Sequence, residues 1–121
     1  MRFLIFICVF ALVLTLGGAA RADSVTHFSS VIDDLPLMAG ISEVGDGVEF
    51  STPDGRIAEV AAEGDVRQAD VLAFYDATLP QLGWRRTGEG AFEREGETLR
   101  LKFEPVEDGI LIRFAVAPTE N

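Results

Sequence analysis

The sequence contains almost no cysteine: Cys8, the single one, lies in an apolar run near the N-terminus. The small residues that precede a lipidated cysteine are missing before it, so we expect no lipid anchor there. If this run is removed on export, the remaining chain has neither a thiol nor a disulfide. Small exported domains of eukaryotes often carry disulfides. Their absence therefore favours an exported bacterial protein.

Positive charge is also scarce, because 10 Lys and Arg residues stand against 20 Asp and Glu residues, for a net charge of −10. Binding to nucleic acid requires a basic surface, so we expect no nucleic-acid partner. The same charge disfavours adsorption to anionic lipid headgroups and keeps copies of the chain apart. We therefore expect a soluble monomer or weak oligomer that does not associate with the membrane once the N-terminal apolar run is removed.

The chain has one histidine, His27, in a polar segment that also holds Ser29, Ser30 and the pair Asp33-Asp34. A Ser/His/Asp site needs groups that converge from a rigid scaffold, which neighbours on one polar segment do not provide. This pattern does not predict catalysis. It leaves open one alternative function, a small periplasmic hydrolase or ligand-binding protein that uses carboxylates and His27.

Glycine motifs do not indicate a cofactor or a metal. Gly88-Glu89-Gly90 has no third glycine and precedes a predicted strand, whereas a phosphate-binding turn opens a helix. Gly45-Asp46-Gly47 lacks the alternating ligands and the closing glutamate of a calcium loop. Trp84-Arg85-Arg86 could recognise an anion, but a core tryptophan beside two solvated arginines is the preferred interpretation. We expect no cofactor, metal or catalytic site.

The N-terminus has the three parts of a secretory signal. Met1-Arg2 is basic, Phe3–Leu16 is apolar, and Ala20-Arg21-Ala22 supplies the small side chains that signal peptidase requires. The apolar run is shorter than the roughly 20 residues of a membrane-spanning helix. We predict that residues 1–22 are cleaved and that Asp23 becomes the new N-terminus, in the periplasm or outside the cell.

Residues 23–47 are rich in Ser, Asp and Gly, and their apolar side chains follow neither a helical nor a strand period. We predict an irregular N-terminal arm there. Two strands, Val48–Thr52 and Arg56–Glu63, flank the turn residues Pro53-Asp54-Gly55, and together they predict a β-hairpin.

A helix is predicted for Asp65–Leu82, because Asp65 and Gln68 fit a capping box and Gly83 suits the position after the helix. Pro80 removes one backbone hydrogen bond, so the last turn should be loosened. An apolar stripe marks the side that packs on the sheet. It consists of Leu72, Tyr75, Leu79 and Leu82, flanked by Val71 and Phe74.

Strands are predicted after the helix at Trp84–Thr87, Ala91–Glu95, Thr98–Glu104 and Ile110–Ala117, separated by glycine-containing turns. Apolar and charged residues alternate in Thr98–Glu104, so one face of the sheet should be buried and the other polar. The expected fold is an α+β, two-layer ββαβββ domain over residues 48–121. Its sheet is mostly antiparallel and is covered on one face by a single helix.

The stretch Phe74–Trp84, FYDATLPQLGW, resembles a helix-to-strand signature of small uncharacterised exported proteins of Gram-negative bacteria. Asp34-Leu35-Pro36-Leu37-Met38 is also similar to a stretch of those proteins. The layout of one helix on an antiparallel sheet more loosely resembles domains of envelope-assembly lipoproteins, although this chain lacks their lipidated cysteine. The resemblance implies a compartment and a fold, but no mechanism.

The polar face of the predicted sheet is the candidate interaction surface. Its residues are Glu59, Glu93, Arg100, Lys102 and Arg113. We expect Glu93 and Glu95 to lie opposite Arg100 and Lys102 in weak cross-strand ion pairs. With the predicted signal segment, this face leads to the prediction of an exported non-catalytic domain that binds an envelope protein. The apolar arm and the edge strand of the sheet, through backbone pairing, remain alternative docking sites.

Overall fold

The computed structural model describes residues 25–120. The predicted signal segment, including Cys8 and the Ala20-Arg21-Ala22 site, lies outside the described residues. The elements, in chain order, are β1 (Val25–Phe28), β2 (Pro36–Met38), β3 (Ser42–Thr52), β4 (Gly55–Gly64), α1 (Gln68–Thr78), the 3₁₀ helix η1 (Leu79–Leu82), β5 (Arg85–Gly88), β6 (Ala91–Arg94), β7 (Glu97–Val106) and β8 (Gly109–Pro118). None of the helices in this part of the chain is long and apolar enough to cross a membrane.

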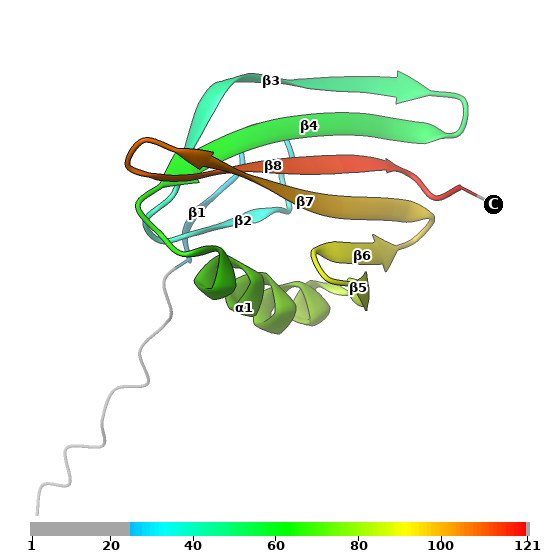
Figure 1. Ribbon diagram of the computed structural model, residues 1–121. Helices are drawn as coiled ribbons and strands as arrows, with labels where there is room; N and C mark the ends of the chain where they lie inside the picture. Colours follow the sequence, from blue (N-terminus) through cyan, green and yellow to red (C-terminus); the bar gives the residue numbers. More distant parts are fainter. Residues whose placement is uncertain (1–24, 121) are drawn as a thin grey trace, which may run out of the picture.

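A six-stranded sheet with the order β3-β4-β8-β7-β6-β5 forms one layer, and every neighbouring pair in it is antiparallel (Figure 1). The helix α1 and a second, two-stranded sheet of β1 and β2 lie on the other side of the core. This arrangement confirms the predicted α+β class, with a mostly antiparallel sheet and a single α-helix. Four strands follow α1, one at each of the four predicted ranges, so the ββαβββ order was one strand short.

The inner face of the sheet follows the predicted alternation. Its side chains come from four adjacent strands and are at most 7% exposed. They are Ala58, Val60, Ala62, Phe92, Leu99, Leu101, Ile112, Phe114 and Val116. The predicted hairpin is also confirmed, since Thr52 pairs with Gly55 across Pro53 and Asp54.

The helix begins three residues later than predicted, at Gln68. Arg67 is its N-cap residue and makes no side-chain capping hydrogen bond, so the predicted capping box of Asp65 and Gln68 is wrong. The reason lies in β4, which continues to Gly64, where the backbones of Gly40 and Gly64 approach so closely that no side chain fits between them. The chain then needs Asp65 to Arg67 to cross from the sheet layer to the helix layer.

The end of the helix matches the expectation for Pro80. After Thr78 the chain tightens into η1, and Gly83 closes it with a φ of 90° while its N–H donates to the carbonyls of Leu79 and Pro80. A φ in this range strains any residue with a side chain, which accounts for glycine here.

The buried stripe of the helix is displaced from the predicted one. Val71, Tyr75 and Leu79, spaced four residues apart, are completely buried. Leu82 is 38% exposed, because η1 winds more tightly than an α-helix and turns this side chain away from the sheet.

The N-terminal arm is not irregular as predicted. Within it β1 and β2 pair in an antiparallel ladder, and β3 begins at Ser42, before the predicted domain boundary at residue 48. The arm lies beside α1 against the inner face of the sheet (Figure 1). The hydroxyl of Tyr75 donates a hydrogen bond of 2.7 Å to the carbonyl of Pro36, which joins the helix to the arm.

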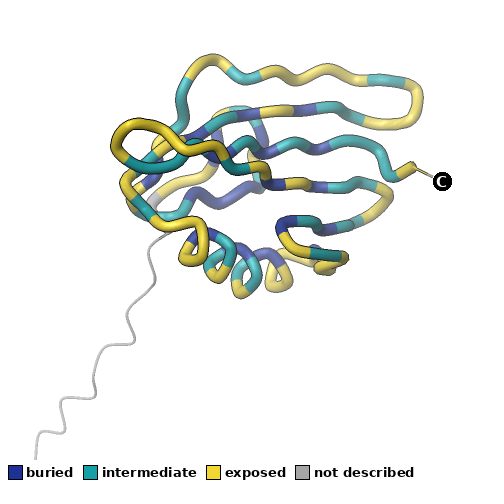
Figure 2. The backbone as a smooth tube through the Cα atoms, viewed as in Figure 1, coloured by how far each residue is buried: buried dark blue, intermediate teal, exposed yellow. Residues whose placement is uncertain are grey.

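The arm supplies a substantial part of the core. Four of its apolar side chains are at most 2% exposed: Ile32, Leu35, Leu37 and Ile41. Figure 2 shows these buried stretches between the sheet and the helix. Since an 11-residue helix covers only part of a six-stranded sheet, the arm covers a further part of the same face.

Candidate functional site

The outer face of the six-stranded sheet is covered by no described element. The helix and the arm both pack on the inner face, and along β4 and β8 buried residues alternate with exposed or half-buried ones (Figure 2). Cross-strand partners share a face, so the register assigns Glu59, Ala115 and Arg100 to one row across β4, β8 and β7. The sheet therefore presents a side to solvent that the fold itself does not use.

Three of the four predicted site residues come together on this face. Lys102 on β7 lies directly opposite Arg113 on β8, and Arg100 is two residues from Lys102 on the same side of β7. Arg100 and Lys102 are exposed and Arg113 is half-buried. We call Arg100, Lys102 and Arg113 the cation surface.

Glu93 lies on the outer face as predicted, but the predicted pairing of Glu93 and Glu95 with Arg100 and Lys102 is wrong. A two-residue turn at Glu95 and Gly96 sets the register of the β6–β7 hairpin, so Glu93 lies opposite Thr98. Its carboxylate pairs with Arg85 at 2.9 Å. Glu95 is in the turn itself, with a φ of 48°, and Ala91 occupies the position opposite Arg100.

The carboxylates around the cation surface engage only one of its members. Arg113 donates to Glu104 at 3.3 Å and lies 3.8 Å from Glu59. Arg100 and Lys102 form no ion pair with any residue between 25 and 120, although five of the eight Lys and Arg residues in this range do. Like charges opposite one another, as at Lys102 and Arg113, destabilise a sheet. A carboxylate from another molecule would relieve this repulsion.

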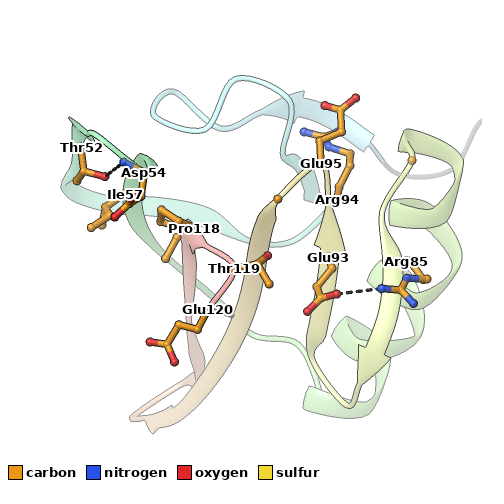
Figure 3. A pocket seen from close by; sticks show the side chains of 13 residues that line it. Thr52, Asp54, Ile57, Arg85, Glu93, Arg94, Glu95, Pro118, Thr119 and Glu120 are labelled. Atoms are coloured by element: carbon orange, nitrogen blue, oxygen red, sulfur yellow. Dashed lines mark hydrogen bonds and ion pairs between the residues drawn. The ribbon is translucent and has the colours of Figure 1, made fainter.

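A shallow concavity of about 1270 Å³ lies at the end of the sheet where the β3–β4 hairpin turns (Figure 3). It extends from Thr52 and Ile57, across Thr119, to the Arg85–Glu93 pair. Acidic and basic groups are mixed along it, and no cluster of three or more His, Cys, Asp or Glu side chains in the described part of the chain could hold a metal ion. His27 does not line it.

Residues of the alternative hydrolase site form a set of hydrogen bonds between the arm and β3. The hydroxyl of Ser30 donates a hydrogen bond of 2.6 Å to the Glu43 carboxylate, and its backbone N–H donates another of 2.9 Å to the same carboxylate. Burial raises the pKa of Glu43, but hydrogen bonds from Ser29 and Ser30 and the charge of His27 together hold it below its ordinary value. A carboxylate with a lowered pKa is a weak base, so these groups are better suited to fastening the arm to β3 than to activating a nucleophile.

The Trp84-Arg85-Arg86 motif also has a structural explanation. Trp84 is 3% exposed and closes the core at the end of η1. Arg85 pairs with Glu93, and Arg86 donates to Asp76 on α1 at 3.2 Å. Both arginines thus have a carboxylate partner within the chain.

An ion-pair network that the sequence analysis did not identify closes this end of the core. Arg94 stacks 4.3 Å from the Trp84 ring centre, donates to the Leu82 carbonyl at 3.0 Å and forms an ion pair with Asp34 of the arm. Arg56 on β4 lies 3.6 Å from Asp34 and binds both carboxylate oxygens of Glu97. The network joins the arm to three strands of the sheet.

The network gives stability a dependence on pH. Burial raises the pKa of Asp34, but the hydrogen bond and charge of Arg94 and the charge of Arg56 outweigh it, so the pKa lies below its ordinary value. A lowered pKa in the folded state contributes stability above the ordinary carboxyl pKa, and this contribution is lost as the pH falls through the folded value. The difference in unfolding free energy between wild type and Asp34→Asn should therefore shrink from pH 7 to pH about 3. Denaturant titrations measure it.

The control is Asp33→Asn, because Asp33 is exposed and forms no ion pair with a described residue. Its stability difference from wild type should stay near zero across the same range. A difference for Asp34→Asn that did not change with pH would show that the carboxylate charge contributes nothing.

The bare outer face and its cation surface are therefore the candidate functional site of the described residues. No family model, curated protein or solved structure matches the chain.

Proposed function

We propose that this chain is an exported, non-catalytic domain that binds a protein of the bacterial envelope through its cation surface. The signal-like residues 1–22 and the resemblance of Phe74–Trp84 to small exported proteins support export. The observation that carries the binding proposal is that Arg100 and Lys102 form no ion pair with a described residue, in a chain with twice as many acidic as basic residues.

The partner surface that fits best carries carboxylates. Arg100 and Lys102 supply two exposed cations that no carboxylate of the described residues engages, and Arg113 adds a third between Glu59 and Glu104. Exposed charges of this kind steer association and make it sensitive to salt. The half-exposed Glu59 and Glu104 allow a basic group of the partner at the rim.

Charge reversal tests this proposal. Affinity capture from an envelope extract at low salt, followed by mass spectrometry, should show that Arg100→Glu with Lys102→Glu lowers recovery of a specific partner at least about tenfold. The substitutions change exposed side chains outside the core, so circular dichroism and melting temperature should stay close to wild type.

Matched controls distinguish the loss of a specific binding site from the effect of a change in net charge. Arg67 is also exposed and also forms no ion pair with a described residue, so Arg67→Glu changes charge as Lys102→Glu does but outside the cation surface. Arg67→Glu and His27→Ala should retain the partner, while Lys102→Glu should weaken recovery. Equal recovery by wild type and the double variant would remove this face from consideration.

A further inference from the structure

The strand β3 is an open edge of the six-stranded sheet. Within residues 25–120 it pairs only with β4, and its other side faces no strand. Val48 and Phe50 are 55% and 51% exposed, and Glu49 and Ser51 are exposed as well. Proteins protect edge strands with proline, lysine, bulges or inward-pointing charges; β3 has a bulge between Val44 and Val48 and an inward-pointing Glu49, but the regular stretch from Val48 to Thr52 has no proline or lysine. The opposite edge, β5, has only four residues and contacts η1.

The two faces of this edge differ in chemistry. Val48 and Phe50 point to the outer face, where their cross-strand partners are Glu59 and Ile57. Glu49 points to the other face, opposite the buried Ala58, and forms no ion pair with a described residue. In a strand added to β3, every second side chain would lie on the outer face beside Val48 and Phe50. The side chains between them would lie on the other face, beside the carboxylate of Glu49.

We propose that β3 accepts an extended segment of a partner protein as an additional antiparallel or parallel strand, and that apolar residues alternate with Lys or Arg in this segment. Backbone hydrogen bonds to the unpaired edge would supply affinity, and the alternation would supply specificity. The basic residues would meet Glu49, while the apolar residues would cover Val48 and Phe50.

A second copy of the chain fits this edge less well. Each copy carries a net charge of −10, so association brings like charge together. An antiparallel pair of β3 strands would also bring two Glu49 carboxylates to the same face of the extended sheet. A basic segment has the complementary charge.

This edge is a separate surface from the cation surface. Strand β4 alone lies between β3 and β8, which carries Arg113, a separation of about 10 Å at the usual strand spacing; Arg100 and Lys102, on β7, are one strand further, at about 14 Å. The inference therefore does not depend on the proposed function, and either can fail alone.

The test uses a blocked peptide of alternating valine and lysine and the chain beginning at Asp23, with binding measured by calorimetry at low salt. Wild type should bind this peptide, and Glu49→Lys should weaken binding at least about tenfold while it creates binding to the matching valine–glutamate peptide. Two N-methylated peptides, one modified at the valines and one at the lysines, cover the two strand directions; one of them should fail to bind, because its methyl groups remove the hydrogen bonds to β3.

Glu63→Lys is the matched control, because Glu63 is also exposed and lies on β4. General attraction of a basic peptide to an acidic protein would be weakened equally by both substitutions, and that result would overturn the proposal. Sedimentation velocity tests whether the edge binds a second copy of the chain. A wild-type dimer whose stability Glu49→Lys changes would assign the edge to that second copy, and this result would also overturn the proposal. Arg100→Glu with Lys102→Glu makes the chain more acidic, so it should not weaken binding of the basic peptide, and the result stays distinguishable from a failure of the cation surface.

Discussion

Replacement of Leu79 by alanine should lower the free energy of unfolding by about 2 to 5 kcal/mol. Leu79 is completely buried at the start of η1, and its backbone carbonyl accepts from Trp84 at 3.1 Å, at the point where the chain turns back toward the sheet. Pro80 follows it directly and fixes the backbone there, so the surrounding structure has little freedom to collapse into the cavity. We therefore expect a loss in the upper part of this range.

Leu82 provides the control for this substitution. It belongs to the same 3₁₀ helix but is 38% exposed, so Leu82→Ala should cost clearly less than Leu79→Ala. Denaturant unfolding followed by circular dichroism compares the two variants. Similar losses for both would mean that the helix layer is packed differently from the arrangement described.

A second large effect is expected from Gly64→Ala. A Cβ atom at Gly64 would overlap the carbonyl oxygen of Gly40, and these are backbone atoms that cannot turn aside like a side chain. The arm and the end of β4 would have to separate, which should cost about 1 to 3 kcal/mol or more. The melting temperature should fall accordingly.

Gly88→Ala is the matched control, since Gly88 also ends a strand and an added Cβ would come no closer than 4.0 Å to Ala91. This variant should be neutral or slightly stabilised, because alanine reduces the freedom of the unfolded chain. If Gly64→Ala were as stable as Gly88→Ala, the close contact between the arm and β4 would not exist.

Local patterns predicted much of the sheet. Alternation in Thr98–Glu104 and Ile110–Ala117 correctly separated the buried face from the polar one, because side chains in a strand point to opposite faces in turn. The turn at Pro53-Asp54-Gly55 and the cap at Gly83 were also predictable, since each depends on the conformational preferences of one or two residues.

Features that depend on distant residues were not predictable. The arm lacks a hydrophobic period, because its core residues are placed by docking on the sheet and the helix and not by one continuous element. The capping box at Asp65 was a sound local pattern, but the contact between Gly40 and Gly64 overrides it.

The candidate site was predictable in part. Arg100 and Lys102 follow from alternation alone, and Arg113 joins them through the pairing of β7 with β8. The pairing of Glu93 was predicted wrongly, because a shift of the turn by one residue changes every cross-strand partner of the hairpin. The Asp34–Arg94 pair spans 60 residues, and no local spacing indicates it.

The central claim is that the cation surface on the outer face meets a partner protein. It is tested most directly by mapping amide chemical-shift changes in the isotopically labelled chain beginning at Asp23 as the captured partner is added. We predict changes concentrated around Arg100, Lys102 and Arg113, weakened by added salt, with α1 little affected. Changes confined to α1 and the arm, with β7 and β8 unaffected, would contradict the claim.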